Sequence, residues 1–287
     1  MLNRRGLTLV ELIVALVLAS VVLGLATTSS LRQQRLHSSI HAVAVADDQL
    51  RAAVRLVASQ LAMLDATAGD LLPGLGMDTA LQFRAPVAHA LSCVTGIGAV
   101  TLRADAAGEV ALGGEASLPR ASDTLWWLGD STWVGRRIAA VTQATVACVA
   151  PVATTSRTTL RLTLGTVDTV PAGAPLRITR QTRYGLYRAS DGTWQLGFRE
   201  WNDPSNQFAA PQPVAGPLLL RVGARHSGFR YFDSAGSELA SSPGPVDVTR
   251  AVRVRITAFS LVTSPAPGQD SVRTDSIDIG LRHAGYP

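Results

Sequence analysis

The sequence predicts an α+β protein in which one long N-terminal helix packs on a C-terminal, antiparallel β-rich domain. Three observations support this class. An apolar run begins at Leu7, an amphipathic pattern with helical spacing follows it, and from about Thr79 onward apolar residues alternate with polar ones. Helical spacing is typical of amphipathic helices, and alternation is typical of half-buried strands.

The N-terminal run has the length and polarity of a membrane span. From Leu7 to Ala26 it has twenty residues with one charge and no proline, enough for a helix to cross the roughly 30 Å core of a bilayer. Arg4 and Arg5 precede the run, so the positive-inside rule predicts a cytoplasmic N-terminus and an exported remainder. A secretory signal peptide cleaved between Ala19 and Ala26 is the alternative, but the small residue Gly6 lies before the apolar run instead of after it.

One acid, Glu11, interrupts the apolar run. A carboxylate within a membrane helix costs about 2.5 to 3.5 kcal/mol on insertion scales, and such residues usually have a partner or a function. Because Glu11 lies one turn into the span, one interpretation is a side chain that reaches the headgroups. A basic partner from another chain explains the position better.

The segment Gly6-Leu7-Thr8-Leu9-Val10-Glu11-Leu12, between a short basic leader and a long apolar helix, resembles the class III signal of type IV prepilins and type II secretion pseudopilins. The resemblance implies a type IV pilin-like fold. It also implies that a prepilin peptidase cuts after Gly6 and methylates the new N-terminus at Leu7. Glu11 would then pair with the free amine of a neighbouring subunit. Phenylalanine is the commonest first residue in the family, and Leu7 departs from it while staying large and apolar.

Beyond the anchor, apolar residues recur at steps of three, four and seven, at positions 36, 40, 43, 50, 54, 57, 61 and 64. This spacing predicts one continuous helix from about Leu7 to Leu64, half of it in lipid and half laid on a globular domain. Pro73 and the glycines beside it end the pattern. We therefore expect a leader over residues 1–6, a transmembrane helix over 7–26, its amphipathic continuation over 27–65 and a β-rich domain over 66–287.

Alternating runs bounded by Gly, Pro, Asp and Ser predict the strands of that domain. They are Ala80–Ala85, Ala99–Arg103, Thr124–Leu128, Trp133–Val141, Thr145–Val149, Thr158–Leu164, Leu176–Arg188, Thr193–Trp201, Leu218–Phe232, Ala251–Leu261 and Ser276–Arg282. Asp191-Gly192 predicts a hairpin that joins Tyr184–Arg188 to Trp194–Phe198. A second hairpin is expected to turn through Asp233–Gly236 toward Glu238.

The C-terminal strands refine the resemblance. The segments Pro217–Val222, Phe229–Gly236 and Arg250–Ile256 are similar to the closing strands of large minor pilins of the PilW type and of the J-type minor pseudopilin of type II secretion. The length of 287 residues agrees with this subgroup, since major pilins are usually shorter.

The two cysteines, Cys93 and Cys148, follow the anchor and therefore lie in the oxidising compartment if the topology is right. We expect one disulfide, which closes a loop of about 55 residues and stabilises the fold by roughly 4 kcal/mol in the chain-entropy model. Two buried free thiols are the alternative.

Other candidate sites carry weak signals. His37 and His41 have the spacing of a zinc pair on a helix but lack a third ligand, and Asp270, Asp275 and Asp278 lack a full calcium-loop pattern. We therefore expect no metal and no cofactor. The sequence has no phosphate-binding loop, nucleophile elbow or H-E-x-x-H motif, which argues against an enzyme. Without the two arginines of the leader, 24 basic residues stand against 21 acidic ones, and this net charge of +3 is too small to indicate nucleic-acid binding.

The five tryptophans are expected to lie mainly in the core, because aromatic residues at alternating strand positions are usually buried. A stacking surface for a single nucleic-acid strand or a sugar is the alternative. Trp126 and Trp127 are adjacent and must point to opposite faces of one strand. This pair is therefore the best candidate for a surface contact.

Together these observations predict a minor type IV pilin, a structural and assembly subunit. The resemblance implies four partners: a prepilin peptidase, other pilins that contact the N-terminal helix, an inner-membrane assembly platform and, before assembly, inner-membrane lipid. A minor pseudopilin of a type II secretion system is one alternative. A pilin that binds DNA or a surface ligand in an uptake or adhesion apparatus is another. In each case we expect a single-pass protein of the bacterial inner membrane whose C-terminal domain is periplasmic.

Overall fold

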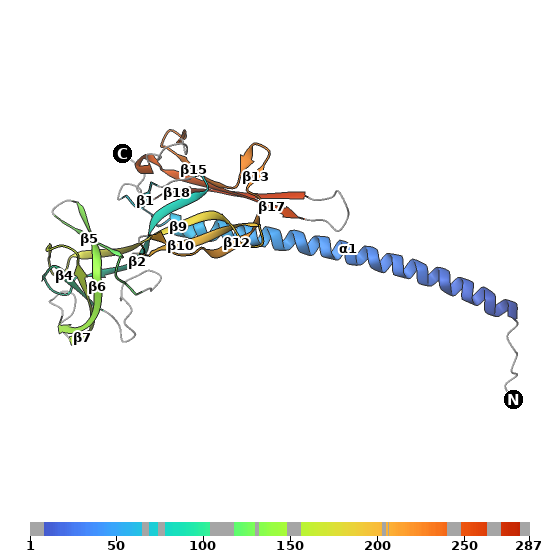
Figure 1. The fold of residues 1–287 in the computed structure, drawn as a ribbon, viewed down its shortest axis with the longest axis horizontal. Coiled ribbons are helices and arrows are strands. Elements are labelled where there is room, and N and C mark those ends of the chain that lie inside the picture. Colours follow the sequence, from blue (N-terminus) through green and yellow to red (C-terminus); the bar gives the residue numbers. More distant parts are fainter. Residues whose placement is uncertain are drawn as a thin grey trace, which may run out of the picture.

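A computed structural model describes residues 9–64, 69–73, 78–103, 118–129, 132–147, 156–202, 205, 207–239, 248–262 and 271–281. Its N-terminal helix, α1 (Leu9–Leu61), extends far from the β-rich remainder of the chain, so the first residues of this helix lie at the opposite end from the strands (Figure 1). The predicted α+β architecture, one long helix followed by an antiparallel β-rich domain, is confirmed.

The C-terminal part of α1 is amphipathic, and its apolar face is buried. The buried residues are Ala46, Leu50, Ala53, Val54, Val57 and Leu61, whose helical spacing is that of one face. This face packs against β12 (Gln212–Leu218), β17 (Arg253–Val262) and β18 (Ser271–Gly280). Leu36 and Ile40, which the pattern placed on the same face, are 61% and 58% exposed. Burial of the helix therefore begins later than the sequence pattern suggests, because the β domain does not reach further along α1.

A ten-stranded antiparallel sheet forms the frame of the domain, in the order β1-β2-β9-β5-β6-β7-β4, with β10 to β12 attached through β9. Its strands are β1 (Leu71–Leu72), β2 (Ala80–Leu91), β4 (Ala99–Arg103), β5 (Thr124–Leu128), β6 (Trp133–Ala147), β7 (Ser156–Leu164), β9 (Pro175–Arg188), β10 (Trp194–Asn202), β11 (Gln207–Phe208) and β12. Two-residue strands pair as β3 (Gly96–Ile97) with β8 (Thr169–Val170) and as β13 (Arg221–Val222) with β14 (Arg225–His226).

A second, four-stranded sheet also packs on α1, through β17 and β18 (Figure 1). Its order is β16-β15-β17-β18, with β15 (Gly228–Phe232) and β16 (Glu238–Leu239) on one side of β17. A short 3₁₀-helix, η1 (Val248–Arg250), precedes β17. The buried face of α1 thus contacts strands of both sheets.

Strand β9 connects two separate hydrophobic cores. Along one edge it pairs with the whole length of β2, from Pro175 to Gly185, whereas along the other edge it pairs first with β5 and then with β10. The proximal core, beside α1, includes Leu50, Val57, Leu61, Leu81, Phe83, Tyr184, Phe229, Tyr231, Val254 and Ile256. The distal core includes Val87, Leu102, Leu125, Trp127, Ile138, Leu162, Leu164, Leu176 and Ile178. We call the parts around them the proximal and distal lobes.

The side chain of Tyr184 contacts both α1 and the ten-stranded sheet. Its ring stacks on Phe83 with 5.9 Å between centroids and lies 5.3 Å from that of Phe198. Its hydroxyl donates a hydrogen bond of 3.1 Å to the side-chain oxygen of Gln60 on α1. A buried aromatic ring with a satisfied polar tip both packs and orients its neighbours.

An ion-pair network occupies the junction of the two cores. Arg180 lies on β9 between Ile178 of the distal core and Tyr184 of the proximal core. Its guanidinium donates two hydrogen bonds, of 2.8 and 2.9 Å, to the carboxylate of Asp123, which is 1% exposed. Arg180 also donates to Glu200 at 3.3 Å, and Arg120 donates to the other oxygen of Glu200 at 2.7 Å. A buried charge of this kind requires its partner, since removal of one member leaves the other uncompensated.

Several predicted strands agree with the structure. Ala99–Arg103 and Thr124–Leu128 have the predicted bounds, and both hairpins are confirmed, with Gly192 at a φ of 85° and the carboxylate of Asp191 accepting the amide of Thr193. The single strand predicted over Leu218–Phe232 is wrong. There, Leu218 ends β12, a small hairpin intervenes, and β15 begins only at Gly228. The two strands predicted within Trp133–Val149 are one strand, β6, whose ladder to β7 shifts register between Ile138 and Ala140.

Asp123→Ala is expected to lower the free energy of unfolding by about 3 kcal/mol, because it leaves the Arg180 guanidinium buried without its main counter-charge. The measurement is chemical denaturation of the full-length protein in detergent. Asp278→Ala is the matched control. Asp278 pairs with Arg255 at 2.6 Å on the surface, where a pair contributes less than about 1 kcal/mol. Equal losses in the two variants would contradict the role of the junction.

Candidate functional site

The exposed part of α1 is the main candidate site. An 18-residue window of this helix has a mean hydropathy of 2.7, and none of it is buried against the rest of the protein. The large exposed side chains here include Leu9, Val10, Leu12, Ile13, Val14, Leu16, Val17, Leu18, Val21, Val22, Leu23 and Leu25. By length and composition this helix can cross a membrane.

The exposed stretch is longer than a bilayer requires. From Leu9 to Val45 it spans roughly 55 Å at about 1.5 Å per residue, whereas the hydrocarbon core takes up about 30 Å. Leu31, Leu36, Ile40 and Val45 remain exposed in the part that lies beyond the membrane span. Exposed apolar side chains therefore continue past the length of a membrane span.

Glu11 lies in the first turn of α1, and its side chain is exposed among apolar neighbours. A carboxylate in the first turn interacts favourably with the positive end of the helix dipole, so this position suits an acid electrostatically. Gly6 and Leu7, the predicted cleavage and methylation positions, lie outside the described residues. Their roles stay predictions.

The predicted disulfide involves one described residue. Cys93 follows β2, is fully buried, and donates its amide to the carbonyl of Thr101 at 2.8 Å. No free cysteine occurs among the described residues. Cys148 lies outside them, so the Cys93–Cys148 bond stays a prediction.

Trp126 and Trp127 point to opposite faces of β5, as predicted. Trp127 is 4% exposed and belongs to the distal core, so it cannot serve as a surface contact. Trp126 is half-buried. Its indole N–H donates a hydrogen bond of 2.9 Å to the hydroxyl of Thr179, and the Arg84 guanidinium carbon lies 5.1 Å from its ring centroid. Gly135 lies close against the ring, since a Cβ at this position would be only 2.6 Å from a ring carbon. These contacts leave little of the indole face for a ligand.

Metal ligation finds no support among the described residues, where no cluster of three or more His, Cys, Asp or Glu side chains occurs. His37 and His41 are exposed on α1. Asp278 forms a two-pronged ion pair with Arg255, and Asp270 lies outside the described residues.

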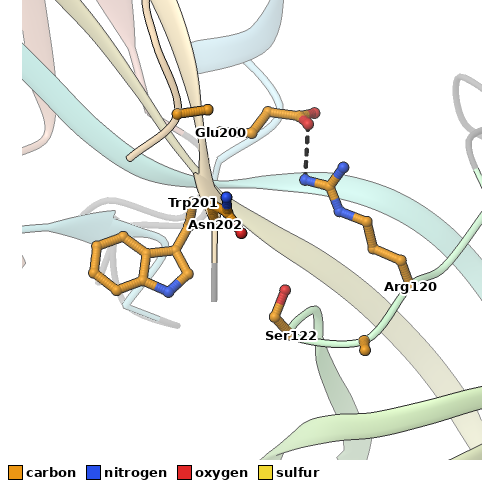
Figure 2. A pocket seen from close by; sticks show the side chains of 7 residues that line it. Arg120, Ser122, Glu200, Trp201 and Asn202 are labelled. Atoms are coloured by element: carbon orange, nitrogen blue, oxygen red, sulfur yellow. Dashed lines mark hydrogen bonds and ion pairs between the residues drawn. The ribbon is translucent and has the colours of Figure 1, made fainter. Parts of the chain in front are cut away.

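A cavity of about 410 Å³ lies at the junction of the lobes, lined by Arg120, Ala121, Ser122, Glu200, Trp201, Asn202 and Ala209. Figure 2 shows Arg120 extending toward Glu200, while the indole of Trp201 points away from this pair. Burial alone would raise the pKa of Glu200, but hydrogen bonds and charges from Arg120 and Arg180 outweigh burial and lower this pKa. The described residues that line it include no histidine or cysteine.

Comparison with known proteins identifies the N-terminal segment. Residues 1–27 match the family model described as the prokaryotic N-terminal methylation motif. No curated protein and no solved structure matches the chain.

The pair formed by Arg120 and Glu200 predicts a pH-dependent stability. Because the folded-state pKa of Glu200 is lowered, its ion pairs stabilise the protein above the ordinary glutamate pKa of about 4.3 and are lost as the pH falls through the lowered value. Glu200→Gln should therefore be less stable than the wild type at neutral pH, and the difference should narrow near pH 3, as measured by urea unfolding of the full-length protein in detergent.

Glu238→Gln is the control for this measurement, since Glu238 pairs with Arg230 at 3.5 Å between exposed side chains. Its difference from the wild type should be small at both pH values. A Glu200→Gln difference that is independent of pH would contradict the assignment.

Proposed function

Because its first 27 residues carry the N-terminal motif of the type IV prepilin and pseudopilin class, we propose that this chain is a minor type IV pilin, a structural and assembly subunit of a pilus. The observation that carries the proposal is the combination of that motif with a helix that is exposed and apolar over its N-terminal part and that buries one face against strands of two sheets at its C-terminal end. A structural subunit needs no catalytic site, and the class itself is one of structural proteins.

Processing would begin at the membrane. A prepilin peptidase removes residues 1–6 by cleavage after Gly6 and methylates Leu7. Arg4 and Arg5 keep the N-terminus in the cytoplasm, while the β domain lies in the periplasm. The predicted Cys93–Cys148 disulfide suits that oxidising compartment.

Assembly would then use the exposed part of α1. An assembly platform in the inner membrane moves the helix from lipid into a filament, where other pilins cover its apolar side chains. The carboxylate of Glu11 pairs there with the free amine at the N-terminus of a neighbour, and opposite charges attract strongly where water is scarce. The exposed residues Leu31, Leu36 and Ile40 support an interface that extends beyond the lipid-embedded part.

The same N-terminal motif also fits a minor pseudopilin of a type II secretion system, and the similarity of the C-terminal strands to the PilW type and the J type does not separate the two. Deletion of the gene distinguishes them. A pilin predicts the loss of surface fibres, adhesion or twitching, whereas a pseudopilin predicts the loss of protein secretion through the outer membrane. A defect in DNA uptake alone would favour a ligand-binding pilin.

The mature protein is expected to begin at Leu7 and to carry one added methyl group on its N-terminal amine. Mass spectrometry of the protein purified from its native membrane measures both features. Gly6→Val should leave the leader attached, because in the family that the sequence resembles the peptidase cuts after a glycine. A mature N-terminus at Met1 or beyond Ala26 would refute the assignment.

Glu11→Leu is expected to be cleaved like the wild type but to enter filaments at least tenfold less, because the pairing charge is lost. The measurement is the ratio of subunit in sheared filaments to subunit in the membrane fraction, determined by immunoblotting. Glu11→Asp keeps the charge and is the control, with most of the incorporation retained. If Glu11→Leu entered filaments normally, Glu11 would have no pairing role.

A further inference from the structure

The cavity at the junction of the lobes has two preformed walls. One wall is the turn over residues 120–123, where the amide of Asp123 donates to the carbonyl of Arg120 at 3.2 Å and the amide of Arg120 donates to the carboxylate of Asp123 at 2.9 Å. The other wall is the β10–β11 hairpin, where the ring of Trp201 meets that of Phe208 edge-on at 5.1 Å. The cavity volume of about 410 Å³ lies within the range of roughly 300 to 1,000 Å³ that is typical of small-molecule sites.

Ser122, in the first wall, has a backbone conformation that favours glycine. Its φ is 79°, and residues with a side chain rarely adopt a positive φ. The carbonyl of Ile138 accepts the amide of Ser122 at 2.8 Å and helps to hold this conformation. Strained backbone of this kind occurs preferentially at functional sites. Glycine would suit the backbone better, but serine adds a hydroxyl to the wall of the cavity.

The charges beside the cavity balance. Arg120 donates to one oxygen of Glu200 at 2.7 Å, and Arg180 donates to the other at 3.3 Å. Arg180 also pairs with Asp123, so two positive and two negative side chains offset each other in this network. An anion would meet the carboxylate of Glu200, and a cation would meet the guanidinium of Arg120. The arrangement therefore favours a neutral ligand.

The groups that line the cavity are suited to binding hydroxyls. A guanidinium has five N–H donors, of which Glu200 accepts one from Arg120, and a carboxylate has about four acceptor sites. The side chains of Arg120 and Glu200 are 45% and 31% exposed. Ser122 and Asn202 add a hydroxyl and an amide, each of which both donates and accepts. Figure 2 shows the indole of Trp201 and the side chain of Arg120 on opposite sides of Ser122, so an aromatic wall faces the polar part.

We propose that this cavity binds a neutral saccharide. Each sugar hydroxyl both donates and accepts, and planar guanidinium, carboxylate and amide groups can each contact two neighbouring hydroxyls. The C–H groups of the same sugar form an apolar face, which an aromatic side chain such as that of Trp201 can cover. The inference is independent of the proposed role in a pilus, since the cavity includes no residue of α1.

The test begins with the full-length protein on an array of neutral and acidic glycans. The detergent must have no sugar headgroup, because a maltoside would compete for the site. We expect binding to at least one neutral glycan, and the soluble form of the glycan that binds best is then titrated by calorimetry. Binding to no glycan, or to acidic glycans alone, would overturn the proposal.

Ser122→Gly separates binding from folding. Glycine removes the hydroxyl but suits a φ of 79°, so this variant should unfold at or above the wild-type temperature and yet bind the glycan about fivefold more weakly. Asn202→Ala removes an exposed amide and should also weaken binding about fivefold. Ser234→Gly is the matched control, because Ser234 is exposed in the turn before β16, and it should bind like the wild type. Equal affinities of the wild type, Ser122→Gly and Asn202→Ala would refute the site.

Titration with the terminal monosaccharide of the same glycan distinguishes two sources of the ligand. Equal affinities for the monosaccharide and the glycan would support a free sugar as the ligand. Tighter binding of the glycan would support a surface polysaccharide or glycoconjugate.

Discussion

The β domain buries only the last turns of α1, and this incomplete burial determines how the molecule can exist. Leu50, Val57 and Leu61 are almost fully buried, whereas nearly every large apolar residue before Ala46 is exposed. Exposed apolar surface of this extent is unfavourable in water. This helix must therefore lie in lipid or against other chains. In the function that we propose, it lies in the inner membrane before assembly and against other pilins in the filament. Glu11 is an acid in the first turn of this helix, and in the role that we propose for it, it makes one packing arrangement specific.

Beyond the helix, stability depends on a single long strand. β9 pairs with β2 along one edge, and β5 and β10 share its other edge, so both cores depend on the same backbone. The two cores are separated at position 180 of β9, where the chain has an arginine and not an apolar residue. The positive charge of Arg180 is paired with the carboxylates of Asp123 and Glu200. A satisfied buried ion pair fixes geometry more than it stabilises. We interpret it as the element that orients the distal lobe relative to the proximal one.

The sequence predicted features that arise from local pattern. Helical spacing predicted a single helix, alternation predicted β5 within its observed bounds, and Asp191-Gly192 predicted the β9–β10 hairpin. It could not show where burial of the helix begins, because Leu36 and Ile40 fit the periodicity as well as Leu50 does. The junction network also escaped prediction, since Asp123, Arg180 and Glu200 are brought together only by strand pairing.

The part of the molecule that makes the proposed filament contacts is separate from the distal lobe, whose surface can vary in sequence. Filament contacts, as proposed, lie on the exposed part of α1, and this helix is held by the proximal core through residues such as Tyr184 and Ile256. The distal lobe is attached through the β2–β9 ribbon and the contacts at the junction. Changes on its surface can therefore alter what the subunit presents without moving α1. Because the distal lobe and the exposed part of α1 are separate parts of the subunit, the distal lobe can acquire a new ligand while the subunit keeps its filament contacts.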